Sequence, residues 1–278
     1  MAVVRLILSG GSAKGLLEAT GAAAALADRG HEISVGAGTS AGGIVIGALA
    51  SGRAPSELRH ALMEQRLGRF VSTKGWRAWL RLALKGALSD GEALAEFLRA
   101  FTVGRTFADA HFDVRITASD YSAGCPRVFS RHTDPDMPLA LAMRATSALP
   151  LAFPAVQYRD RWFKDGGIYA NVPVEAGIRA LDERVVIFAL AQAPGACEND
   201  TPWRADVGLV REVGRAVDLL IDANVEAELA KAPEGAVTVF SDGLGFGTLD
   251  FDLTASDKQE LYEHGYGLTY AALEEAGL

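Results

Sequence analysis

One serine near the start of the chain lies in a glycine-bounded motif, residues 38–42, which reads G-T-S-A-G. The residues before the motif predict a strand and those after it predict a helix. A serine at such a sharp turn is presented for nucleophilic attack, and the positions two before and two after it must be small because the two backbones pass close together. Gly38 and Gly42 meet that requirement. The motif therefore predicts attack of Ser40 on an ester carbonyl, with the start of the following helix directing its dipole and free N–H groups at the oxyanion.

A second glycine-rich segment, residues 10–15, reads G-G-S-A-K-G and also precedes an expected helix. It is not a P-loop, because Leu16 follows Gly15 where that motif needs lysine. It is not a dinucleotide fingerprint, because Ser12 replaces the middle glycine and no acidic residue ends the second strand. What remains is a loop of N–H groups suited to a carboxylate, a phosphate or an oxyanion. The candidate oxyanion or substrate-binding residues are Gly10, Gly11, Ser12, Lys14 and Gly15; Lys14 either adds positive charge there or is a solvated lysine.

A nucleophilic serine needs a proton acceptor, and two residues are candidates. His264 is the only histidine late enough for a Ser–Asp–His order, but its polar surroundings predict a surface or half-buried helix position. Asp165 follows an apolar stretch and precedes Gly166 and Gly167, which allow a tight turn. An ordinary aspartate, with a pKa of about 3.9, is a weak base, and burial raises that value. By the local pattern alone, a surface Asp-Gly turn is the simpler interpretation.

The glycine loop, the serine motif and the Asp165 turn, in this order, resemble the patatin-like phospholipase family. Residues 143–154 are similar to the segment that precedes the aspartate turn in that family, and Asn171 and Pro173 fit the pattern after it. The resemblance covers about residues 3–191. It implies an α/β fold, a three-layer α/β/α sandwich with a mostly parallel central sheet.

The same resemblance implies a Ser40–Asp165 dyad in place of a triad. N–H groups around Gly11 and Ser12 would hold the oxyanion, and an acyl-serine intermediate would form on Ser40. No metal or organic cofactor is implied. Ser12 departs from the family, which usually has a third glycine there, and a positive φ at that position would strain a serine.

Alternating strand and helix signals along the chain support this fold class. No repeat or linker divides the sequence, so we expect a single domain over residues 1–278. Strands are expected at 3–8, 33–37, 114–119, 127–130, 184–191 and 236–241. Helices are expected at 13–29, 41–50, 138–148, 174–181, 207–231 and 256–275.

Composition excludes several classes of protein. A net charge of −8 without a basic cluster disfavours nucleic-acid binding. Cys125 and Cys197 lie at no metal-ligand spacing, so two free thiols are expected. The N-terminal apolar run is too short for a signal peptide and no run is long enough to span a bilayer, which favours a cytoplasmic protein.

Residues 56–100 are the candidate for a helical cap or lid. Within them, residues 74–85 place Lys74, Arg77, Arg81 and Lys85 on one helical face, with tryptophans and leucines over much of the rest. Such a helix either contacts an anionic membrane peripherally or covers the acyl pocket. A helix packed on the core is the simplest alternative.

The expected function is a serine lipid acyl-hydrolase of the phospholipase A, lysophospholipase or carboxylesterase type, with a lipid or ester as substrate. An acyltransferase with the same acyl-serine and a non-catalytic lipid-binding protein are the alternatives. The sequence does not distinguish hydrolase from transferase. The presence of both Ser40 and Asp165 argues against a binding protein.

Overall fold

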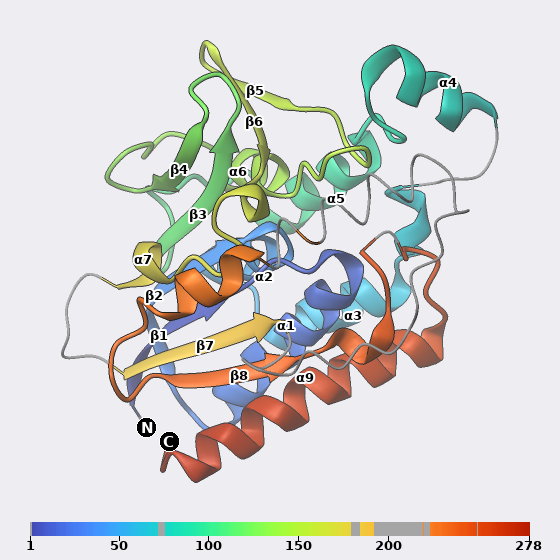
Figure 1. The fold of residues 1–278 in the computed structure, drawn as a ribbon. Coiled ribbons are helices and arrows are strands. Elements are labelled where there is room, and N and C mark those ends of the chain that lie inside the picture. Colours follow the sequence, from blue (N-terminus) through green and yellow to red (C-terminus); the bar gives the residue numbers. More distant parts are fainter. Residues whose placement is uncertain (1, 72–75, 179–183, 192–218, 220–222, 249) are drawn as a thin grey trace.

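The structure is a computed structural model that describes residues 2–71, 76–178, 184–191, 219, 223–248 and 250–278. A mostly parallel sheet forms the middle layer, and helices cover both of its faces (Figure 1), which confirms the predicted fold class. In β1 (Val3–Leu8), Leu6 and Leu8 belong to the hydrophobic core on one face. Ile7 belongs to the core on the other face. This alternation is what a strand buried on both sides requires.

The sheet has the strand order β5-β6-β3-β2-β1-β7-β8, with β4 paired to β3 outside this path. Pairing is parallel between β1, β2, β3, β7 and β8, and antiparallel where β4 and β6 meet β3 and where β5 meets β6. The strands after β1 are β2 (Glu32–Thr39), β3 (Asp113–Asp120), β4 (Cys125–Ser130), β5 (Val156–Tyr158), β6 (Arg161–Asp165), β7 (Arg184–Leu190) and β8 (Val237–Ser241).

β2 and β6 both pair with the same edge of β3. The other edge is occupied by β4, which pairs with β3 from Arg115 to Asp120. β2 pairs in parallel up to Thr117, and β6 pairs in antiparallel fashion from Ala118 onward. The carboxyl ends of β2 and β6 therefore meet head to head, between Thr117 and Ala118 of β3.

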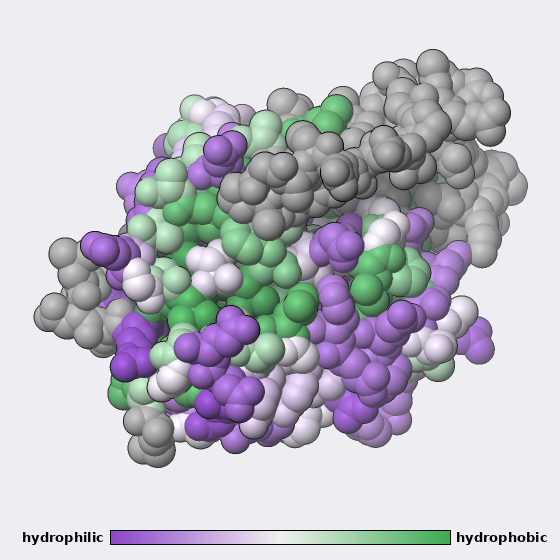
Figure 2. All heavy atoms as spheres, turned by 60° about the horizontal axis from the view of Figure 1, so that its bottom comes forward, coloured by the Kyte–Doolittle hydropathy of each residue, from purple (hydrophilic) through white to green (hydrophobic). Residues whose placement is uncertain are grey.

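Four helices gather on one side of the sheet: α1 (Ser12–Asp28), α2 (Ser40–Ala50), α3 (Pro55–Glu64) and the long α9 (Ala255–Glu275). α1 and α9 approach closely because glycines lie at the crossing: a Cβ at Gly21 would be 2.2 Å from the carbonyl oxygen of Tyr262, and one at Gly265 would be 2.2 Å from that of Glu18. Figure 2 shows the molecule with the lower side of Figure 1, where α9 lies, brought toward the viewer. In this view, hydrophilic residues cover most of the lower part of the surface, and hydrophobic residues gather in the middle.

Residues 56–100 do not form one uniform element. α3 is part of the body, since Leu58 and Leu62 are fully buried in the main core. α5 (Glu92–Thr102) packs against α6 (Leu139–Thr146). α4 (Trp76–Lys85) projects away from the sheet (Figure 1); its Ala78 joins the main core, whereas its Leu84 is 74% exposed.

Several expected elements differ from the structure. β5 and β6 were not predicted, because β5 is only three residues long and β6 is rich in charged residues. The helix expected at 174–181 is the short α7 (Val174–Gly177), because Ile178 is already extended; residues 179–181 lie outside the described residues. Of the helix expected at 207–231, residues 223–229 are helical, and most of the remainder, like Cys197, lies outside the described residues. None of the described helices combines the length and apolar character needed to cross a bilayer.

Candidate active site

Ser40 lies at the junction of β2 and α2, where the chain turns sharply from strand to helix. Its φ of 50° is the left-handed conformation, which a serine adopts only when its surroundings enforce it. The crowding at this corner explains the flanking glycines. A Cβ at Gly38 would lie 2.5 Å from backbone atoms of Gly42, and one at Gly42 would lie 2.3 Å from the carbonyl oxygen of Leu8.

Asp165, the last residue of β6, contacts Ser40 directly. The Ser40 hydroxyl donates a hydrogen bond of 2.6 Å to Oδ2 of Asp165, across 125 residues of sequence. The N–H of Gly167 donates to Oδ1 at 2.8 Å, which is the turn that the two glycines were expected to allow. The contact follows from the head-to-head meeting of β2 and β6 on the edge of β3.

Asp165 is 1% exposed, and the burial of its carboxyl group raises its pKa to about 6. The Ser40 hydroxyl, the Gly167 N–H and the positive charge of Lys164 act in the opposite direction, because each stabilises the ionised form. A carboxylate with this pKa is a stronger base than an ordinary aspartate, yet it is still ionised at neutral pH.

The backbone around both residues is fixed by side chains that the sequence reasoning did not single out. Thr146, on α6, accepts a hydrogen bond from the N–H of Ser40 at 2.8 Å and donates one to the carbonyl of Thr117. Ser119, on β3, donates its hydroxyl hydrogen to the Asp165 carbonyl at 2.6 Å. The resemblance of residues 143–154 to the family segment was the one available signal for Thr146.

Two neighbouring cations were also missed: Lys164, whose charge acts on Asp165, and Arg144, whose charge acts on Lys164. Lys164 donates to the carbonyl of Phe153 at 2.7 Å, and Arg144 lies over the Phe153 ring at 4.9 Å. Burial and the neighbouring Arg144 lower the pKa of Lys164 to about 8, and burial lowers the pKa of Arg144 to about 10. The positive charge near Asp165 favours its ionised form.

The glycine loop packs against the nucleophile. A Cβ at Gly10 would lie 3.2 Å from the Cβ of Ser40 and 2.4 Å from the side-chain oxygen of Asn171. The N–H of Gly10 donates to the Asn171 carbonyl at 3.0 Å, so Asn171 joins this loop to the segment that follows Asp165. In the described part of the chain, the N–H groups of Gly11 and Ser12 have no recorded acceptor.

Ser12 does adopt the positive φ considered above, at 58°, and its buried hydroxyl has no hydrogen-bond partner among the described residues. Gly15, one turn into α1, donates its N–H to the Gly11 carbonyl at 2.9 Å. Lys14 points away from the loop: its ammonium group donates to the carbonyl of Phe246.

His264 lies on α9 in a separate polar cluster. Its Nδ1 is 2.8 Å from Oε1 of the buried Glu18, and the Ser241 hydroxyl donates to the same carboxylate. His264 is thus a half-buried helix residue, as predicted. Among the described residues, no contact joins it to Ser40. No cluster of three or more potential metal-ligating side chains occurs in the described ranges.

The basic helix is described only in part. Lys74 and Gly75 lie outside the described residues, as do the side chains of Trp76, Arg77, Trp79 and Lys85. Arg81 donates to the Leu88 carbonyl at 2.9 Å and pairs with Asp90, while Leu80 is exposed.

The tight corner at Ser40 yields a stability prediction. We expect Gly38→Ala to lower the free energy of unfolding by about 3 kcal/mol, because its methyl group would overlap the Gly42 backbone, which cannot move aside without displacing α2. Gly267→Ala in α9 is the matched control: nothing lies within 4 Å of its Cβ, so we expect a gain of about 0.5–1 kcal/mol. Chemical denaturation measures both, and equal stability of the two variants would contradict the prediction.

Comparisons with known proteins bear on this arrangement. Residues 6–178 match the family model described as patatin-like phospholipase. The cGAMP-activated phospholipase of Vibrio cholerae is 36% identical over 160 residues, which cover 51% of this chain and 44% of that protein. The uncharacterized protein YqhO of Bacillus subtilis is 26% identical over 291 residues, 97% of each chain.

Among solved structures, VipD from Legionella pneumophila is similar in fold. The two structures align with a TM-score of 0.57 and 14% sequence identity, covering 99% of this chain and 67% of VipD. At this identity the likeness concerns the fold alone.

Proposed function

Because this chain belongs to the patatin-like phospholipase family and is thereby a lipid-hydrolysing enzyme, we propose that Ser40 is its nucleophile and Asp165 its general base. The observation that carries the proposal is the 2.6 Å hydrogen bond from the Ser40 hydroxyl to the Asp165 carboxylate. It gives a hydroxyl the adjacent proton acceptor that nucleophilic catalysis requires.

The reaction has two steps. As Ser40 Oγ attacks the ester carbonyl, its proton passes to Asp165 Oδ2 and a tetrahedral oxyanion forms. The carbon–oxygen bond to the alcohol then breaks, the alcohol takes the proton from Asp165, and the acyl group remains on Ser40. Asp165 next takes a proton from water, whose oxygen attacks the acyl-serine, and the fatty acid departs as the proton returns to Ser40.

We propose that the glycine loop holds the oxyanion. Support comes from the N–H groups of Gly11 and Ser12, which find no acceptor among the described residues, and from the close approach of Gly10 to Ser40. The Ser40 N–H, in contrast, is occupied by Thr146. The positive φ of Ser12 is consistent with a loop whose shape is maintained for function at a cost in strain. Lys14 is not required in this role, since its ammonium group is bound by Phe246.

The substrate is a lipid, and within that class we propose a carboxylic ester of the phospholipase A, lysophospholipase or carboxylesterase type. An acyltransferase that uses the same dyad is the alternative, because an alcohol can replace water in the second step. We further propose that residues 1–278 act as one acyl-hydrolase domain. This is supported by the main core, in which Val4, Leu17 and Leu261 from both ends of the chain pack together.

We also propose that residues 74–85 cover the acyl pocket or contact the membrane. This proposal now concerns α4 alone, since α3 is buried against the body.

Product analysis tests the proposed function. When the protein is incubated with a diacyl phospholipid and then quenched in acid, we expect a free fatty acid, a lysolipid and protein that carries an acyl group on Ser40. Added glycerol should leave the fatty acid as the main product of a hydrolase, whereas an acyltransferase would acylate glycerol. An acyl group on any residue other than Ser40 would contradict the assignment of the nucleophile.

A further inference from the structure

The glycine loop, residues 10–15, is bordered by residues from the C-terminal part of the chain, beyond the segment 6–178 that the family model matches. Leu190, the last residue of β7, packs against the loop, because a Cβ at Gly11 would lie 2.2 Å from its Cδ2 atom. The N–H of Leu190 also donates to the hydroxyl of Ser9 at 2.7 Å. The shape of the loop therefore depends on residues that the family model does not include.

Lys14 makes a second contact between the loop and the C-terminal part of the chain. It lies in the first turn of α1, and its ammonium group donates to the carbonyl of Phe246, 232 residues later. Phe246 belongs to the turn that follows β8, residues 242–246. A Cβ at Gly243 would lie 2.6 Å from Cδ of Lys14, so the lysine side chain lies directly against this turn.

The turn 242–246 is held in one shape by its own hydrogen bonds. The N–H of Gly243 donates to the Ser241 hydroxyl at 3.1 Å, and the N–H of Phe246 donates to the Gly243 carbonyl at 3.1 Å. Leu244 keeps a positive φ of 52°, which a leucine adopts only when its surroundings enforce it. The carbonyl that receives Lys14 is therefore a fixed point rather than part of a loose loop.

α1 has another anchor on the same segment, one helical turn further on. Glu18 is fully buried and accepts a hydrogen bond of 2.8 Å from the hydroxyl of Ser241, the last residue of β8. Because Lys14 and Glu18 are four residues apart, they lie on one face of the helix. Two anchors on this face hold the start of α1, from which the N–H groups of Gly11 and Ser12 project.

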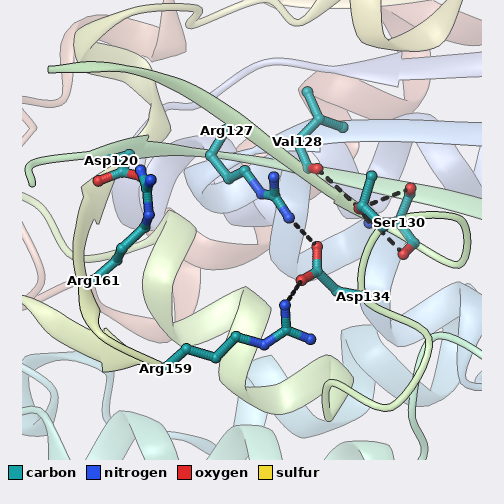
Figure 3. A network of polar contacts seen from close by, with 8 residues as sticks. Asp120, Arg127, Val128, Ser130, Asp134, Arg159 and Arg161 are labelled. Atoms are coloured by element: carbon teal, nitrogen blue, oxygen red, sulfur yellow. Dashed lines mark hydrogen bonds and ion pairs between the residues drawn. The ribbon is translucent and has the colours of Figure 1, made fainter. Parts of the chain in front are cut away.

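The partner of Lys14 is unusual for a charged side chain. The hairpin that contains β4 shows the common arrangement, in which Asp134 pairs with Arg127 at 2.8 Å and with Arg159 at 3.7 Å (Figure 3). Lys14 has no carboxylate within ion-pair distance among the described residues, and its half-buried ammonium group binds a backbone carbonyl instead. Since a charged donor makes the stronger hydrogen bond, this contact is suited to fixing one backbone segment against another.

We propose that Lys14 is a positioning residue for the oxyanion site. Its bond to the Phe246 carbonyl fixes the start of α1 so that the N–H groups of Gly11 and Ser12 stay aimed at the oxyanion. Accurate aim matters, because a displacement of about 1 Å lowers a catalysed rate by about 10²-fold. The inference rests on the proposed function, since it gives Lys14 a part in the same reaction. Lys14 acts through the backbone and touches no reacting atom.

Two glycines of the turn provide a matched pair of variants. Gly243 and Gly245 both have a positive φ, 70° and 76°, so alanine strains the backbone alike at both positions. The methyl group of Gly243→Ala would meet the flexible end of Lys14 and push it away from Phe246. The methyl group of Gly245→Ala would meet nothing within 4 Å.

The substrate for the test is p-nitrophenyl butyrate, a soluble ester without a phosphate group. We expect Lys14→Met and Gly243→Ala each to lower kcat by roughly tenfold to a hundredfold and to leave KM within about twofold of the wild type. The double variant should lose little more than either single one, because both remove the same contact. Lys14→Arg, which keeps a charged donor, should recover part of the loss, and Gly245→Ala should retain the wild-type kcat to within about twofold.

Hydrogen–deuterium exchange reports on the loop without any chemistry. We expect the amides of residues 10–15 to exchange about tenfold faster in Lys14→Met and in Gly243→Ala than in the wild type or in Gly245→Ala. Unchanged exchange in Lys14→Met would overturn the inference, as would equal losses of kcat in the two glycine variants, since backbone strain would then explain them.

A rival role for Lys14 is recognition of lipid phosphate. A normal kcat of Lys14→Met on the soluble ester, together with a raised KM on an anionic phospholipid, would establish that role and overturn the inference. Failure of the proposed dyad would appear separately, as hydrolysis of the soluble ester by the Ser40→Ala protein. The exchange measurement would still show whether Lys14 holds the loop.

Discussion

A Ser40→Ala variant is expected to hydrolyse lipid esters at least about 10⁴-fold more slowly than the wild type and to resist labelling by a fluorophosphonate. Removal of the nucleophile abolishes the acyl-enzyme pathway and leaves only binding and oxyanion stabilisation, which account for a small part of the rate. The measurements are kcat/KM on a phospholipid and the extent of covalent labelling. Folding should be retained, because alanine removes only the hydroxyl group and leaves the hydrogen bond from the residue 40 N–H to Thr146 in place.

Ser51→Ala is the control for that experiment. Ser51 ends the same helix, α2, and its hydroxyl donates to the Ala48 carbonyl at 2.7 Å, far from Asp165 in the sheet. We expect it to be labelled like the wild type. Labelling of the Ser40→Ala protein at the wild-type rate would show that another residue is the nucleophile.

An Asp165→Asn variant is expected to lose about 10³–10⁴-fold in kcat/KM and to lose the acid limb of the pH profile. Asparagine fills the same space and still accepts a hydrogen bond from Ser40, but it cannot take the proton. In the wild type, burial raises the pKa of Asp165 to about 6, so the active, ionised form appears as the pH rises through that value. We therefore expect kcat/KM to fall by about tenfold for each pH unit below 6.

Asp160→Asn is the matched control, because Asp160 lies on the same hairpin but is exposed at its turn. It should retain both the rate and the acid limb. If Asp165→Asn reacted with a fluorophosphonate as fast as the wild type near neutral pH, Asp165 would not be the base.

The local patterns in the sequence predicted the elements that depend on local interactions. The strand before Ser40, the corner itself and α2 follow from small residues at fixed spacing, and the structure contains all three. β6 was not predicted, because its five residues pair with β3 and β5, which lie elsewhere in the chain. Charged residues within it, such as Arg161 and Lys164, conceal a strand whose stability comes from pairing.

The partner of Ser40 illustrates the same limit. Taken alone, Asp165 followed by two glycines predicted an exposed turn, and only the resemblance to a family suggested a base. Its burial and its contact with Ser40 depend on two strand ends meeting on the edge of β3, which no local pattern encodes. The roles of Thr146 and Ser119, which bind the backbones of Ser40 and Asp165, were not predicted for the same reason.

The head-to-head junction of β2 and β6 makes enzymatic activity a direct report on strand alignment. A slip of β6 by one residue against β3 would turn Asp165 to the opposite face, and a slip of two would carry it roughly 7 Å from Ser40. Neither misaligned chain retains a proton acceptor within reach of the serine, although each would keep nearly all of its secondary structure. A folding intermediate of this protein should thus be spectroscopically native-like and yet catalytically silent, and the onset of turnover during refolding would time the final pairing of β6.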